Sequence, residues 1–122
     1  MKFYVCAHCG NIIAYAEDKG VPVSCCGEIM QELVPNTKEA SVEKHLPVIE
    51  QAGTVVTVKI GSAPHPMLPE HYIGWVALET KQGNQRKPLP LDGAPQIKFA
   101  LTEGDEIVAA YAWCNLHGLW KA

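Results

Sequence analysis

The chain has 122 residues, of which 48% are hydrophobic and 19% are charged, and this length fits one ordinary domain or two small ones. Its longest apolar run near the C-terminus, residues 107–113, is far shorter than the roughly 20 residues of a membrane-spanning helix. Ten Lys and Arg against thirteen Asp and Glu give a net charge of -3 without a basic cluster, which argues against a nucleic-acid partner. The N-terminus leads directly into cysteines instead of a signal-peptide core, so we expect a soluble protein of the cytoplasm.

Residues 1–36 are expected to form a small, turn-rich domain. Four of the five cysteines fall within its first 26 residues: Cys6, Cys9, Cys25 and Cys26. A unit of fewer than about 40 residues usually needs a metal, disulfides or a partner for stability. Because the total number of cysteines is odd, a closed disulfide framework is disfavoured and a metal is predicted. A polar, proline-containing connection separates this domain from residues 37–122.

Residues 37–122 show the two-residue periodicity of β-strands. Strands are predicted within residues 54–60, 71–80, 96–101 and 105–114, with turn signals between them. No segment of eleven or more residues carries a helical stripe. The second domain is therefore expected to be an antiparallel β-sandwich. Its residues 81–95, rich in glycine, proline and polar side chains, are expected to form a long surface loop.

The N-terminal cysteines have the spacing of a tetrathiolate metal site. Cys6 and Cys9 form a C-x-x-C turn, in which two thiolates converge on one ion, and a glycine after each cysteine pair permits a tight backbone. Cys25 and Cys26 are adjacent, so both can bind one ion only if the backbone bends there. Four thiolates select zinc or iron. The residues alone leave a structural zinc site and an iron centre open.

A second group of metal-ligating side chains is spread through residues 37–122. It comprises His45, His65, His71, Cys114 and His117. Imidazole and thiolate are ligands for iron, copper or zinc, and each of these histidines follows or precedes a proline, a glycine or a charged residue. The remaining histidine, His8, is interpreted as a solvent-facing spacer between two cysteines. A blue-copper carrier is less favoured, because no methionine follows Cys114 to act as axial ligand.

Taken together, these motifs resemble the desulfoferrodoxins, the two-iron class of superoxide reductases. Residues 6–12 and 25–28 resemble the desulforedoxin-type iron-tetrathiolate motif. The motifs of the catalytic domain are resembled, in the family's order, by residues 43–49, 61–67, 70–73 and 114–120. The resemblance covers nearly the whole chain, and only the expected loop at 81–95 cannot be anchored to the family.

The resemblance implies a mainly β protein in which a small desulforedoxin- or rubredoxin-like domain precedes an immunoglobulin-like antiparallel β-sandwich. It implies two iron ions per chain, one bound by the four N-terminal cysteines. The other would have one axial ligand, the thiolate of Cys114, and four equatorial imidazole ligands: His45, His65, His71 and His117. Its sixth position would be open in the reduced state. Superoxide would bind there, take up one electron and two protons, and leave as hydrogen peroxide without release of oxygen.

The family's Glu-Lys-His arrangement matches Glu43, Lys44 and His45. It implies that Glu43 occupies the open position in the ferric resting form and that the charge of Lys44 attracts the anionic substrate. The family also suggests reduced rubredoxin, or a similar carrier, as electron donor, and the small N-terminal unit favours a homodimer. Two alternatives to a superoxide reductase stay open. One is a rubredoxin-like electron carrier with a structural second metal site, and the other is a zinc-stabilised binding module without redox chemistry.

Overall fold

The computed structural model describes residues 1–122, which divide into two compact units, Met1–Val34 and Pro35–Ala122. The division lies two residues before the domain boundary expected from the sequence. The reason is Asn36, whose backbone N–H donates to the carbonyl of Leu119 at 3.0 Å. The Asn36 side chain also bonds the backbone N–H and carbonyl of Lys121. These contacts make the start of the connection part of the second unit.

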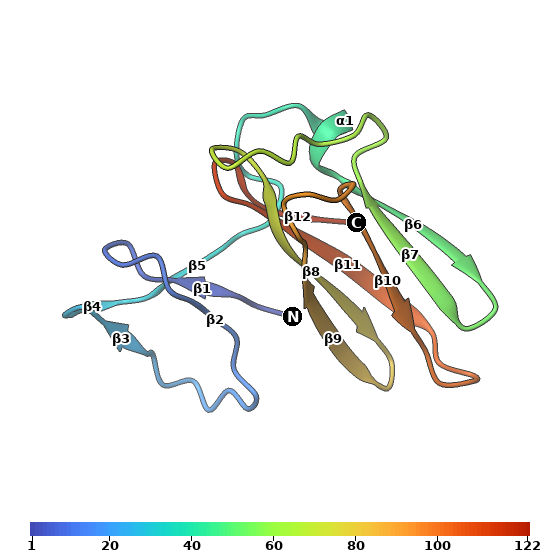
Figure 1. The fold of residues 1–122 in the computed structure, drawn as a ribbon. Helices are drawn as coiled ribbons and strands as arrows, with labels where there is room; N and C mark the ends of the chain where they lie inside the picture. The colour runs from blue at the N-terminus through green and yellow to red at the C-terminus, as the bar shows by residue number, and fades with distance from the viewer. The chain divides into compact units, whose positions relative to one another are not determined.

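The first unit consists of two-residue strands joined by turns (Figure 1). β1 (Tyr4–Val5) pairs antiparallel with β2 (Ile12–Ile13) and with β5 (Gln31–Glu32), and β3 (Ser24–Cys25) pairs antiparallel with β4 (Glu28–Ile29). Its buried hydrophobic side chains are those of Phe3, Cys6 and Met30. Burial of so few side chains contributes little to the stability of a 34-residue unit, so other interactions must hold it together.

The second unit is the predicted antiparallel β-sandwich, with sheet orders β10-β7-β6 and β12-β11-β8-β9. The strands of the first sheet are β6 (Pro47–Ala52), β7 (Val55–Ile60) and β10 (Gln96–Ala100). Those of the second are β8 (Ile73–Thr80), β9 (Gly83–Pro88), β11 (Ile107–Cys114) and β12 (Gly118–Lys121). The helix α1 (Val42–His45) precedes β6 and has four residues. A membrane-spanning helix, with its long apolar stretch, is not found among the helices of this chain.

The core lies between the two sheets and confirms the alternation expected from the sequence. In β7, Val56, Val58 and Ile60 are fully buried, whereas the residues between them are exposed or half-buried. They belong to one cluster with side chains of β8, β10 and β11, among them Phe99 and Cys114. Cys114 is therefore fixed by the packed core.

The expectation of a loop over the whole of residues 81–95 is wrong. Residues Gly83–Pro88 form β9, which pairs with β8 from Thr80 opposite Gly83 to Trp75 opposite Pro88. The sequence did not indicate this strand because β9 is an edge strand of mostly polar residues, none of which is buried. Pro88 is compatible with the end of such an edge strand. The edge strands β6 and β12 were not predicted either.

A β-bulge in β8 determines how β11 ends. Trp113 lies opposite Trp75, but the next residue, Cys114, lies opposite Ile73, so Gly74 is the extra residue. A Cβ atom at Gly74 would lie 2.8 Å from the Trp113 ring, and glycine avoids this clash. Because of the bulge, Ile73 instead of Gly74 lies opposite Cys114, and the side chains of Ile73 and Cys114 are both fully buried.

Candidate metal centres

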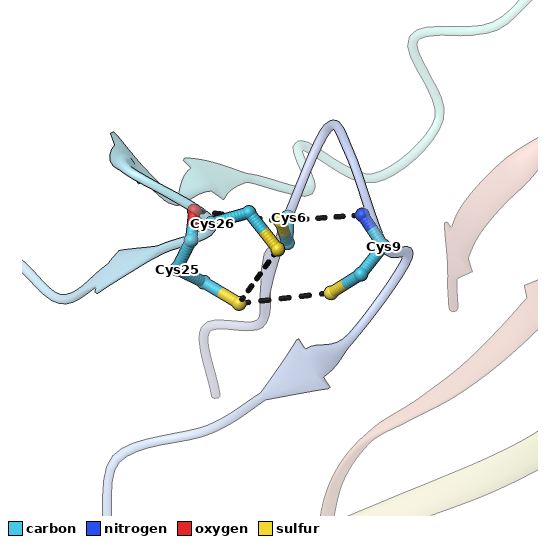
Figure 2. A group of neighbouring side chains, drawn as sticks. All are labelled: Cys6, Cys9, Cys25 and Cys26. Carbon is cyan, nitrogen blue, oxygen red and sulfur yellow. Dashed lines mark hydrogen bonds between the residues drawn. The ribbon is translucent and has the colours of Figure 1, made fainter.

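The four N-terminal cysteines converge in the first unit, as Figure 2 shows. Their sulfur atoms all lie within 4.8 Å of one another, with 3.6 Å between Cys9 and Cys25 and 4.0 Å between Cys25 and Cys26. Four sulfurs bound to one tetrahedral ion at about 2.3 Å would lie about 3.8 Å apart. The arrangement therefore fits a tetrathiolate metal site.

The backbone bend that two adjacent cysteines require lies between β3 and β4. Cys26 and Gly27, the two residues of this hairpin turn, have φ angles of 53° and 81°. Positive φ at both positions is the mark of a type I′ turn, which is favoured between paired strands. On the opposite side of the cluster, Gly10 has a φ angle of 79° and its N–H donates to the carbonyl of Cys6 at 3.0 Å.

The electrostatics of the cysteine cluster favour a bound cation. The backbone N–H of Cys9, followed by that of His8, lowers the pKa of the Cys6 thiol to about 6. Hydrogen bonding with the sulfurs of Cys9 and then Cys6 raises the pKa of Cys25 to about 12. One thiolate thus disfavours ionisation of its neighbours, and four thiolates coexist only around a cation. The interpretation of His8 as solvent-facing fits its exposed side chain, which lies 3.1 Å from Glu28.

In the second unit, the four predicted histidines form a closed square of rings. The centroid distances between neighbouring rings are 4.6, 4.6, 5.1 and 5.0 Å, with interplanar angles between 76° and 85°, in the order His45, His65, His71, His117 and back to His45. His45 and His71 lie across the square at 6.3 Å. The Cys114 sulfur is 3.9 Å from Nδ1 of His117 and within 4.8 Å of a ring nitrogen of each other histidine. The structure thus brings all five predicted side chains together.

The hydrogen bonds of the rings show that a cation fits the centre of this square. His45 Nδ1 lies 2.7 Å from the carbonyl of Ser41, and His65 Nδ1 lies 2.7 Å from the carbonyl of Pro66. Because a carbonyl only accepts, each Nδ1 carries the proton and each Nε2 presents a lone pair. These two Nε2 atoms are 3.2 Å apart, near the roughly 3 Å expected for neighbouring nitrogens bound at about 2.1 Å.

One ring nitrogen of the square has no partner at all. Nε2 of His71 is buried and makes no hydrogen bond, which is costly unless a ligand is bound there. Burial lowers the pKa of His45, His65 and His71, to about 4 for His65, so these rings are neutral at pH 7. Burial also raises the pKa of Cys114, although the N–H groups of Leu116 and His117 act in the opposite direction. A metal cation would bind the neutral rings and ionise the thiol.

Three segments at one end of the sandwich carry these ligand atoms: α1, the loop between β7 and β8, and the end of β11 together with the turn that leads to β12 (Figure 1). Asn115, in this last turn, was not singled out from the sequence. Its Oδ1 accepts from the Tyr72 N–H at 2.8 Å and its Nδ2 donates to the Glu70 carbonyl at 3.0 Å. It thereby ties the segment of His71 to the turn that directly follows Cys114. The available signal was an asparagine in a turn, where its side chain commonly bonds backbone.

Glu43 and Lys44 are exposed residues of α1, directly before His45. Burial is the main cause that lowers the pKa of His45 and of His71. The positive charge of Lys44 is a smaller cause that lowers both, so Lys44 acts on both rings. The Glu43 carboxylate accepts from the Ser41 hydroxyl at 3.5 Å and is not among the converging ligand atoms. The roles of these two residues stay predictions.

Known proteins are similar to this chain in both sequence and fold. The Desulfoferrodoxin family model matches residues 37–122. The desulfoferrodoxin of Nitratidesulfovibrio vulgaris is 39% identical over 99% of this chain and 94% of its own length. The superoxide reductase structure from Treponema pallidum is 43% identical with a TM-score of 0.83 and covers 98% of both chains. A superoxide reductase (1Fe-SOR) from Giardia intestinalis is 33% identical with a TM-score of 0.56, over 66% of this chain and 95% of its own. The chain belongs to the desulfoferrodoxin family.

Proposed function

We propose that this chain is a superoxide reductase, which reduces superoxide to hydrogen peroxide at the histidine square of its second unit. The observation that carries the proposal is the closed square of four imidazoles with the Cys114 thiol beside it. Relatives that bear the name superoxide reductase support it, and one of them aligns with only 66% of this chain. The family model matches residues 37–122, which contain the histidine site and not the cysteine cluster, so the histidine site is the better candidate for the reaction.

The residues fit ferrous iron, held by His45, His65, His71 and His117 with Cys114 as thiolate ligand. Imidazole and thiolate together suit iron. When bound, the iron would supply the single electron that superoxide needs, and the thiolate would donate electron density to it. The complete reaction adds one electron and two protons to superoxide and yields hydrogen peroxide. Because no second superoxide is oxidised, no oxygen is formed.

The protein's own groups would prepare this reaction in three ways. The carbonyls of Ser41 and Pro66 orient His45 and His65 so that their Nε2 atoms point inward. The N–H groups of Leu116 and His117 stabilise the Cys114 thiolate. Lys44 keeps a positive charge near His45 and His71, which favours approach of an anion. We assign Glu43 to the ferric resting state, in which its carboxylate would be a further ligand that holds the iron.

The cysteine cluster would hold a second iron ion as an auxiliary electron centre, with Cys6, Cys9, Cys25 and Cys26 as ligands. Reduced rubredoxin, or a similar one-electron carrier, is the proposed donor. None of the five cysteines forms a disulfide, which suits the reducing cytoplasm. A homodimer is supported by the exposed apolar side chains of the first unit: Val21, Val23, Ile29 and Val34. A plain electron carrier with a structural histidine site is not favoured.

The proposal can be tested by mixing the reduced, iron-loaded protein with superoxide. The histidine site should oxidise within the mixing time and develop a low-energy thiolate-to-iron absorption, separate from that of the cysteine cluster. Iron analysis should give about two ions per chain, as the two ligand groups require. If both sites hold iron and superoxide leaves the histidine site reduced, the proposed function is wrong.

A further inference from the structure

Trp120 contacts two of the four histidines in different ways. Its indole N–H donates to the backbone carbonyl of His117 at 3.1 Å. Its ring stacks on the imidazole of His45, with a centroid distance of 4.9 Å and an interplanar angle of 29°. Trp120 is only 2% exposed. One side chain therefore joins the turn that carries His117 to the helix that carries His45.

The backbone of Trp120 is held from both sides. In β12, Trp120 lies opposite Ala112 of β11, in the same pairing that places Gly118 opposite Cys114. On the other edge of β12, Asn36 bonds the carbonyl of Leu119 and both backbone groups of Lys121. Backbone hydrogen bonds thus hold the strand before and after Trp120. The indole therefore has a fixed position, and other side chains can pack against it.

Helix α1, in contrast, has little stability of its own. It comprises four residues, and Ser41 at its N-terminus makes no side-chain capping bond. A helix this short does not form without tertiary contacts. On one side, its Glu43 carbonyl accepts from the N–H of Ala63 at 3.0 Å. On the side of the histidine square, His45 stacks on Trp120 in addition to its contacts with the rings of His65 and His117.

We infer that Trp120 is a positioning residue that holds His45 and His117 at neighbouring corners of the histidine square and thereby slows loss of the bound metal. The inference rests on the metal site of the proposed function but not on its reaction with superoxide. Nε2 of His45 and Nδ1 of His117 are 3.1 Å apart. The His45 ring stacks on Trp120, and the backbone carbonyl of His117 accepts from the Trp120 indole N–H. If either contact is lost, the corresponding histidine is no longer held in place by Trp120.

Two substitutions separate the two contacts. Trp120→Phe keeps an aromatic face against His45 but removes the donor to His117, whereas Trp120→Leu removes both. Trp75→Leu is the matched control, because Trp75 stacks on Trp113 at 6.4 Å instead of on an imidazole. A merely structural role of Trp120 would lower stability and leave the metal spectrum of the folded protein unchanged.

The experiment follows the low-energy thiolate-to-iron band of the oxidised, iron-loaded full chain after addition of a chelator. Trp120→Leu should release iron faster than the wild type, by about 10 to 100 times if the usual loss of metal affinity on removal of a supporting group is expressed in the release rate. Trp120→Phe should show a shifted band and an intermediate rate, and Trp75→Leu should match the wild type. An unchanged band and rate in Trp120→Phe, or equal acceleration in Trp75→Leu and Trp120→Leu, would overturn the inference. If Trp120→Leu does not fold, Trp120→Phe decides. A wild type that lacks the band contradicts the proposed function instead.

Discussion

The Nε2 atoms of His45 and His65 lie 3.2 Å apart, although each ring already uses its Nδ1 proton in a bond to a backbone carbonyl. Two lone pairs at this distance repel each other, and no proton is available between them when both rings are neutral. Burial lowers the pKa of both rings, so protonation does not relieve the repulsion at pH 7. A metal cation does, and this requirement underlies the predictions that follow.

Cys9→Ser should remove the visible absorption of the tetrathiolate centre and loosen residues 1–34, because the metal supplies most of the folding free energy of so small a unit. Oxidation of the histidine site by superoxide should survive. Absorption spectra and rapid mixing check both parts. His8→Ala is the control, because His8 is exposed between the cysteines and should leave the spectrum intact. Failure of Cys9→Ser to react with superoxide, with iron in its histidine site, would contradict the division of roles.

Cys114→Ser is expected to be the most damaging single change at the histidine site. A protonated hydroxyl is a harder and much weaker donor than a thiolate, so the electron supply to the metal and the thiolate-to-iron band should both disappear. Cys114 is also fully buried, so unfolding should be measured alongside the spectrum. His117→Ala should mainly weaken metal retention. A Cys114→Ser protein that keeps the band would require another ligand set.

Lys44→Ala should lower the second-order rate constant for superoxide by roughly tenfold, because a ferrous ion with one thiolate and neutral imidazoles keeps a net positive charge that Lys44 reinforces. The dependence on salt should also flatten, since screening over about 10 Å at 0.1 M acts on the same attraction. Glu43→Ala should not slow the reaction.

Pulse-radiolysis rates measured against ionic strength test the role of Lys44. Lys98→Ala, in the outer strand β10, is a control for the loss of a positive charge. If Lys44→Ala and Lys98→Ala change the rate and its salt slope equally, Lys44 has no special part in attracting the substrate.

Asp105 provides a prediction on stability. Hydrogen bonds from Thr80, at 2.6 Å, and from the N–H groups of Glu106 and Gln82 lower the pKa of this carboxyl below 3.8. Because the pKa is lower in the folded state, Asp105 stabilises the fold above pH 3.8, and this stabilisation is lost as the pH falls through the folded-state pKa. Asp105→Asn should thus unfold at a lower temperature than the wild type near neutral pH, and the difference should shrink in acid.

Thermal unfolding of the wild type and Asp105→Asn between neutral pH and pH 3 measures this difference, and metal loss in acid is common to both proteins. Asp92→Asn, in the exposed turn before β10, is the control. A difference between wild type and Asp105→Asn that stays constant with pH would show that the charge of Asp105 does not act on stability.

The site was more predictable than the strands around it. Spacing and residue chemistry identified all nine side chains that converge, because thiols and imidazoles are recognisable one by one. Alternation identified β7, whose buried residues lie on one face. β9 was missed because an edge strand of polar residues carries no alternation. Trp120 and Asn115 were missed as supports because their contacts join segments far apart in the chain, which no local pattern shows.

The most direct test of the account is the stoichiometry of the reaction. The iron-loaded protein, kept reduced by an excess of a one-electron donor, is supplied with a known amount of superoxide, and hydrogen peroxide and oxygen are both measured. Reduction requires that every superoxide consumed by the protein appears as one hydrogen peroxide, without oxygen. Half as much peroxide, together with an equal amount of oxygen, would mean dismutation and would contradict the proposed function.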